Sequence, residues 1–126
     1  MSSREFQRIA AARALAFLFR ACDEGKPYTL FDVRDAHSFS HGAIPTAIGL
    51  SEHDVGTWLM KLPRSQPILI YCFQGFSSQT FAKTFADFGF SEVYSIDGGF
   101  PALREALLRA RDAAGDDSAA SPPAES

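Results

Sequence analysis

One cysteine stands where it could act as a nucleophile. Residues 71–90 read YCFQGFSSQTFAKTFADFGF, so Cys72 ends an apolar stretch and precedes a glycine-bearing turn and a helix. If the turn curls so that its backbone N–H groups point at the sulfur, it forms an anion-binding nest. The positive end of the following helix acts at the same point. Both effects lower a cysteine pKa, so the pattern predicts an activated thiolate beside an anion site.

The residue types of this six-residue loop indicate which of its groups could bind a substrate. Gly75 permits a tight turn, and Ser77 can donate a hydroxyl hydrogen bond to an anion. Ser77 or Ser78 is expected to cap the helix. We therefore predict Cys72 as the catalytic residue, with a substrate-binding loop made of Phe73, Gln74, Gly75, Phe76 and Ser77.

Two reactions fit such a thiolate, namely attack on the sulfane sulfur of thiosulfate and attack on a phosphate or arsenate oxyanion. A tetrahedral oxyanion needs a wider cradle than one sulfur atom, and phosphate sites usually carry an arginine. The loop is short and lacks arginine, which favours sulfur chemistry. A merely structural reading also stays open, because cysteine is often buried at strand ends.

The bulk composition indicates one domain. The chain has 126 residues, of which 46% are apolar, enough for a packed core. Its net charge of −3 does not favour a nucleic-acid partner. Residues 112–126 hold four acidic and no basic side chains, which leaves residues 1–111 at about +1. We expect a single domain over residues 4–111 and a disordered acidic tail over residues 112–126.

The remaining reactive side chains predict no cofactor, no metal and no membrane partner. The two cysteines suit a reducing cytoplasm rather than a disulfide framework. Cys22 is expected to be a partly buried structural thiol. His37, His41 and His53 lack metal-ligand spacing. The apolar run 9–19 is interrupted by Arg13 and is too short to cross a bilayer.

Strand-like and helix-like segments alternate along the chain. Strands are predicted at 28–33, 47–50, 66–72 and 92–96, and helices at 4–24, 51–62, 77–88 and 101–110. This order predicts an α/β domain with a mainly parallel sheet and helices on both faces. Functional groups of such sheets gather at the carboxyl ends of the strands, where Cys72 lies.

Three stretches together resemble the rhodanese family, and within it the single-domain thiosulfate sulfurtransferases of the GlpE type. They are LFDVRDAHSFSHGAIPTAIGL, ILIYCFQGFSSQ and GFSEVYSIDGGFPAL, and they cover about residues 28–104. The resemblance implies a rhodanese-like fold with about five strands. It also implies a short opening strand at residues 5–9 and a first helix that starts near Ala11. Asp32 and Arg34 form the family's Asp-x-Arg signature and could act in catalysis, but Asp32 is expected instead to pair with an arginine or with loop amides and so stabilise the fold.

The resemblance implies a double displacement at Cys72, with the amides of residues 73–77 around it. The thiolate takes the outer sulfur of thiosulfate, or of a persulfide donor, and passes it to cyanide, a small thiol or a protein thiol. Many members carry a basic or small polar residue in this loop, whereas Phe73 and Phe76 are large and apolar. A non-catalytic binding or regulatory module is therefore one alternative, and thiosulfate could be a poor donor. A Cdc25-like phosphatase or an arsenate reductase is the other alternative.

Overall fold

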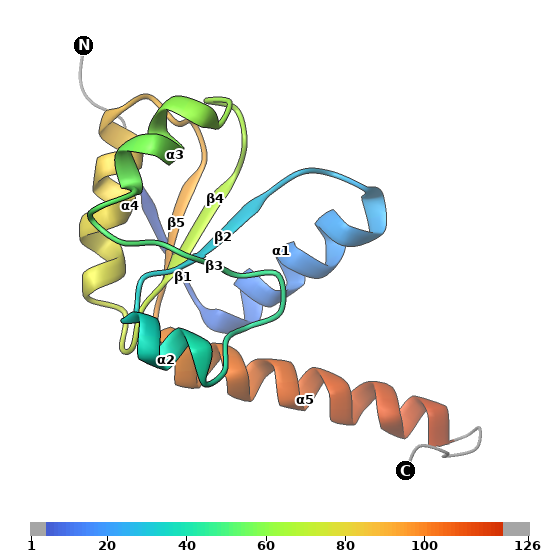
Figure 1. Ribbon diagram of the computed structural model, residues 1–126. Helices are drawn as coiled ribbons and strands as arrows, with labels where there is room; N and C mark the ends of the chain where they lie inside the picture. Colours follow the sequence, from blue (N-terminus) through green and yellow to red (C-terminus); the bar gives the residue numbers. More distant parts are fainter. Residues whose placement is uncertain (1–4, 120–126) are drawn as a thin grey trace.

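The chain folds into a five-stranded parallel sheet with five helices. The computed structural model describes residues 5–119 (Figure 1). The strands are β1 (Gln7–Ile9), β2 (Thr29–Asp32), β3 (Ile48–Gly49), β4 (Ile68–Tyr71) and β5 (Val93–Ile96). The helices are α1 (Ala11–Glu24), α2 (Ala36–Ser40), α3 (Val55–Lys61), α4 (Ser77–Asp87) and α5 (Gly99–Ala119). The strand order is β1-β5-β4-β2-β3, and every pair is parallel, which confirms the predicted fold class.

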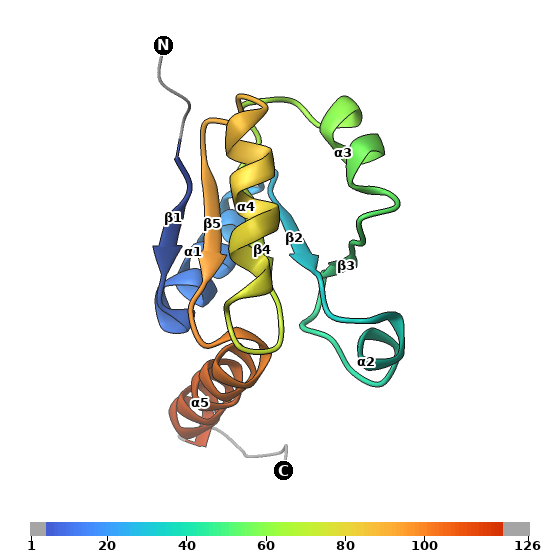
Figure 2. The ribbon, with the colours of Figure 1, turned by 90° about the vertical axis from the view of Figure 1, so that its left-hand side faces the viewer.

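Alternating side chains of the central strands build one core on each face of the sheet. Ile68 and Ile70 of β4 pack with α3 and α4, in a cluster that includes Phe31 and Phe85. The intervening residues of β4 face the opposite core, which α1 and α5 cover. This alternation is the two-residue period of a strand buried on both faces. Figure 2 shows α4 lying across one face of the sheet, with α1 behind it.

The amino-terminal segment has the strand and helix that the family resemblance implies, rather than the single helix that its composition predicts. Residues 4–24 are rich in helix formers, but Gln7–Ile9 form a strand that pairs with β5, Gln7 opposite Tyr94. Helix α1 then begins at Ala11 and ends at Glu24, and the positive φ of 66° at the following Gly25 suits a glycine C-cap. The prediction of one helix from residue 4 is therefore wrong, because pairing with a distant strand outweighs local propensity.

The carboxyl-terminal helix differs from its predicted bounds. Helix α5 begins at Gly99 and continues to Ala119, whereas the sequence predicts a helix over 101–110. Residues 112–119 of the expected disordered tail are thus helical, and residues 120–126 lie outside the described residues. Figure 1 shows α5 projecting beyond the body of the sheet. None of the described helices is long and apolar enough to cross a membrane.

Candidate active site

Cys72 lies at the carboxyl end of β4, the middle strand of the sheet. Its carbonyl oxygen accepts a hydrogen bond from the Phe100 N–H at 2.8 Å, which ties the start of the loop to the first turn of α5. The residue is 4% exposed, so the sulfur is largely shielded from water. Strand β4 therefore places the thiol at the edge of the sheet formed by the carboxyl ends of the strands, where the sequence predicts the functional groups.

Backbone and hydroxyl groups surround the sulfur. The Gly75 N–H donates to Cys72 Sγ at 3.0 Å, and Ser78 Oγ lies 3.5 Å from the same sulfur. Burial alone raises the thiol pKa, but the Ser78 hydroxyl and the amides of Ser78, Gly75 and Gln74 outweigh it, so the net pKa is lowered. The loop amides do face the sulfur, in the arrangement that stabilises a thiolate.

Two buried serines extend this network away from the loop. Ser78 and Ser95 are both 0% exposed, and their hydroxyl oxygens lie 2.8 Å apart. When the sulfur is ionised, Ser78 can donate to it while accepting a hydrogen bond from Ser95. Both hydroxyl hydrogens then have an acceptor, which is the favourable state for buried polar groups. The pair thus favours an anionic sulfur.

The N-terminus of α4 is not capped by a serine, although the sequence predicts that Ser77 or Ser78 caps it. Ser78 belongs instead to the site around the sulfur, a role that the sequence did not predict. Phe76 occupies the N-cap of α4, and no side chain caps the helix there. Neither Ser77 nor Ser78 is a cap, because Ser77 is the first helical residue and Ser78 turns inward to the sulfur. A single residue changes direction by about 100° along a helix, so the sequence alone could not separate the two serines.

Two glycines allow the loop to fold tightly against the turn after β5. Gly75 has a φ of 97°, and a Cβ there would lie 3.0 Å from the backbone nitrogen of Gly98. Gly99 has a φ of 63°, and a Cβ there would collide with the carbonyl groups of Cys72 and Phe73. Both positions need the left-handed region and a close backbone approach, which other residues adopt at a cost.

A buried ion pair between Asp32 and Arg34 links the end of β2 to the residues around the candidate site. Asp32 is 0% exposed and accepts hydrogen bonds from Arg34 Nη2 at 2.7 Å and from the Tyr71 hydroxyl at 2.7 Å. Arg34 Nη2 also donates to the Gly42 carbonyl, and its guanidinium lies 3.9 Å from the Phe100 ring centre. Burial, followed by the bond to Asp32, raises the Tyr71 pKa well above its ordinary value. The expected pairing of Asp32 with an arginine is confirmed, and that arginine is Arg34.

A small pocket of about 250 Å³ opens beside Cys72. Its lining consists of Val33, Arg34, Asp35, Cys72, Phe73, Gln74, Phe76 and Ser77. Five of the six predicted site residues therefore line one pocket, and the sixth, Gly75, is buried and contacts the sulfur. Phe76 and Phe73 are 73% and 49% exposed, so their rings form an apolar rim.

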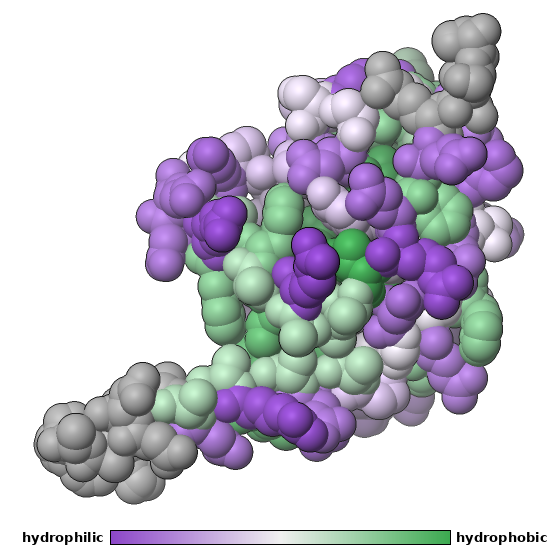
Figure 3. Space-filling model, turned by 180° about the vertical axis from the view of Figure 1, so that it is seen from behind, coloured by the Kyte–Doolittle hydropathy of each residue, from purple (hydrophilic) through white to green (hydrophobic). Residues whose placement is uncertain are grey.

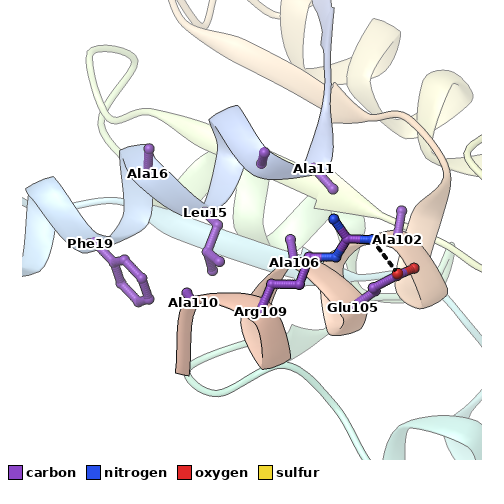
Figure 4. Close-up of a pocket in the computed structure, with 10 residues that line it drawn as sticks. Ala11, Leu15, Ala16, Phe19, Ala102, Glu105, Ala106, Arg109 and Ala110 are labelled. Carbon is purple, nitrogen blue, oxygen red and sulfur yellow. Dashed lines mark hydrogen bonds and ion pairs between the residues drawn. The ribbon is translucent and has the colours of Figure 1, made fainter. Parts of the chain in front are cut away.

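Larger hollows lie elsewhere and offer less chemistry. One pocket of about 470 Å³ lies between α1 and α5, and its lining is mostly alanine with Leu15 and Phe19 (Figure 4). The ion pair between Arg109 and Glu105 spans one side of it at 2.9 Å. Hydrophobic residues gather above α5 in the view from behind (Figure 3). No cysteine or histidine lines this pocket, so the smaller pocket is the candidate active site.

The second cysteine and the histidines take no part in this site. Cys22 is exposed, which corrects the expectation of a partly buried thiol, and its sulfur lies 3.7 Å from the Tyr28 hydroxyl. The His37 and His41 rings lie 4.2 Å apart on α2 and the residue that follows it. Within residues 5–119, no group of three or more His, Cys, Asp or Glu side chains could hold a metal ion.

Comparison with known proteins agrees with the fold. The family described as "Rhodanese-like domain" matches residues 18–106. The chain is 37% identical over 100 residues to the thiosulfate sulfurtransferase GlpE of Pseudomonas savastanoi, which covers 79% of this chain and 89% of that protein. A rhodanese-like domain protein from Staphylococcus aureus superposes with a TM-score of 0.63 at 21% identity, covering 78% of this chain and 91% of that one.

A further solved structure is a protein of unknown function from Rhodopseudomonas palustris, described as a possible tyrosine phosphatase. It has a TM-score of 0.67 and 25% identity, and covers 81% of this chain and 82% of that one. A parallel sheet with a cysteine-bearing loop at the end of its middle strand identifies this chain as a rhodanese-like domain. The chain belongs to the rhodanese family, as its sequence predicted.

Proposed function

We propose that the protein is a thiosulfate sulfurtransferase that works through a persulfide on Cys72. The Cys72 thiolate attacks the outer sulfur of thiosulfate, the S–S bond of the donor breaks, and sulfite leaves with the electron pair. A persulfide anion remains on Cys72. A nucleophilic acceptor then attacks the outer sulfur of that persulfide and regenerates the thiolate. No cofactor or metal takes part in either step.

The hydrogen bond from the Gly75 N–H to the Cys72 sulfur, at 3.0 Å, carries this proposal. A backbone amide aimed at the sulfur stabilises negative charge there before substrate arrives. The same loop can stabilise the persulfide anion, with Gln74 and Ser77 exposed beside it for contact with substrate. The names of the GlpE relatives support thiosulfate as a donor.

The second half of the reaction takes an acceptor with a nucleophilic atom. Cyanide, a small thiol and a protein thiol all fit the chemistry, and a protein persulfide fits as an alternative donor. A stable thiolate at Cys72 suits a reducing compartment such as the cytoplasm. Both steps would take place in a single rhodanese domain that contains all five strands of the sheet.

Steady-state transfer from thiosulfate to cyanide tests the proposal, with thiocyanate as the product measured. The wild-type protein should give the parallel double-reciprocal lines of a double displacement. Cys72→Ser should give no thiocyanate above the uncatalysed rate. Cys22→Ser is the matched control, since it removes the exposed cysteine, and should keep the wild-type rate. Activity that survives in Cys72→Ser would refute the proposal.

A binding or regulatory module is the second candidate, and the exposed rings of Phe73 and Phe76 favour it. Such a module needs no activated thiol. Its Cys72 would titrate near the ordinary cysteine value of about 8.5. The lowered Cys72 pKa and the inward loop amides support catalysis instead.

A further inference from the structure

The charges around the Cys72 pocket do not favour a dianion. Arg34 is the one Lys or Arg among the described lining residues, and its guanidinium is bound to the buried carboxylate of Asp32 at 2.7 Å. The Arg34 side chain is also only 4% exposed. Asp35 adds an exposed carboxylate, and Ser38 hydrogen bonds lower the pKa of Asp35, so it stays ionised. The pocket therefore has no uncompensated cation to attract a doubly charged donor.

The rim of the pocket is apolar where a charged rim would help thiosulfate. Phe76 is 73% exposed at the N-cap of α4, directly beside the loop. Phe73 is 49% exposed on the other side of Gln74 and Gly75. Neither ring belongs to a core cluster of the described residues. The Arg34 guanidinium lies 5.7 Å from the centre of the Phe73 ring, so Phe73 has a partner within the fold, and Phe76 is the ring that core packing does not explain. Exposed rings next to a reactive group mark a surface that contacts an apolar ligand.

We propose that this site prefers sulfane sulfur carried on an apolar organic group, as a monoanion, over inorganic thiosulfate, and that Phe76 determines the preference. The inference rests on the proposed function and names its donor class. Stacking of the carrier group on the Phe76 ring supplies the binding that the absent cation does not. The backbone amides of the loop are left to stabilise the one negative charge on the sulfur.

Benzenethiosulfonate is a suitable probe, because it presents the same outer sulfur as thiosulfate with an aryl group and one less charge. The Cys72 thiolate attacks its outer sulfur, and the S–S bond to the sulfonyl sulfur breaks. Benzenesulfinate leaves with the electron pair, and Cys72 keeps a persulfide anion. Two single negative charges enter the reaction and two leave, so atoms and charge balance without an oxidant or reductant.

The test is the ratio of kcat/KM for benzenethiosulfonate to kcat/KM for thiosulfate, measured with cyanide as acceptor. Phe76→Ser should lower this ratio about tenfold, since loss of part of a phenyl contact removes that much binding. Phe76→Lys should lower it further by raising kcat/KM for thiosulfate, and the gain should fade in high salt. Phe88→Ser is the matched control, because Phe88 is 51% exposed at the far end of α4 and should leave the ratio unchanged.

Asp35→Asn tests the charge independently of the rim. Asparagine can keep the cap on the Ser38 N–H, so the variant removes the charge and little else. It should raise kcat/KM for thiosulfate several-fold and leave that for benzenethiosulfonate less affected. Equal effects of Phe76→Ser and Phe76→Lys on both donors would overturn the inference while the proposed function stands. Turnover of neither donor by the wild-type protein would instead refute the proposed function.

Discussion

The Ser78 hydroxyl is predicted to stabilise the Cys72 thiolate and so to lower the Cys72 pKa. A hydrogen bond to a charged group contributes about 1.5–3 kcal/mol. Sulfur is a weaker hydrogen-bond acceptor than oxygen, and Ser78 Oγ lies 3.5 Å from it, so we take the lower end of that range. One pKa unit corresponds to about 1.36 kcal/mol. Ser78→Ala should therefore raise the Cys72 pKa by about 1 unit.

The rate of Cys72 alkylation as a function of pH measures this pKa, because only the thiolate reacts. The sign follows from the lowered pKa of Cys72. Below the pKa the thiol is unreactive, and the rate rises with pH along a titration curve whose midpoint lies below that of an ordinary cysteine. In Ser78→Ala the whole curve should move to higher pH. The experiment is done in a Cys22→Ser background, because Cys22 is exposed and would react as well.

Three further variants separate the hydroxyl from a general loss of structure. Ser78→Thr keeps a hydroxyl at this position and should restore a low pKa. Ser77→Ala removes an exposed hydroxyl that makes no hydrogen bond to the sulfur and should leave the pKa of the free thiol unchanged. Ser95→Ala should raise the pKa less than Ser78→Ala does, because it acts only through Ser78. An alkylation curve for Ser78→Ala that coincides with the wild-type curve would refute the reasoning.

The other predictions concern the supports of the loop. Gly99→Ala should destabilise the fold by about 2 kcal/mol, because its φ of 63° is strained for alanine and its Cβ would collide with the Cys72 carbonyl group; urea unfolding measures the loss, and an unchanged midpoint would contradict it. Asp32→Asn should cost about 3–5 kcal/mol, since it leaves the buried charge of Arg34 without its partner. Thermal denaturation of that variant should show a clear fall in Tm, larger than the fall in Tyr71→Phe, which removes only a neutral donor to Asp32.

The position of the candidate nucleophile could be predicted from sequence because its signals are local. The apolar run 68–71, the following glycine and the start of a helix all lie within a dozen residues of Cys72. The carboxyl end of a parallel strand is where such a loop must lie. The short loop and its lack of arginine also favoured sulfur chemistry over phosphate chemistry, because a tetrahedral oxyanion needs a wider cradle than one sulfur atom.

The serine network could not be predicted, because it depends on contacts between distant residues. Ser95 lies on β5 and reaches Ser78 only because β5 pairs with β4, Ile70 opposite Ser95. A polar residue within the apolar segment 92–96 was the available signal, and it does not say which partner it meets. The local sequence pattern did not predict the strand at Gln7–Ile9 for the same reason, since this strand forms by pairing with β5, which lies most of the chain away in sequence.

The intact mass of the protein after incubation with a sulfane donor tests the central claim most directly. With thiosulfate, or with benzenethiosulfonate in parallel, the account predicts the gain of one sulfur atom that cyanide then removes. The gain should persist in Cys22→Ser and vanish in Cys72→Ser. A protein that gains no sulfur from either donor, or one that still gains it in Cys72→Ser, would contradict the account.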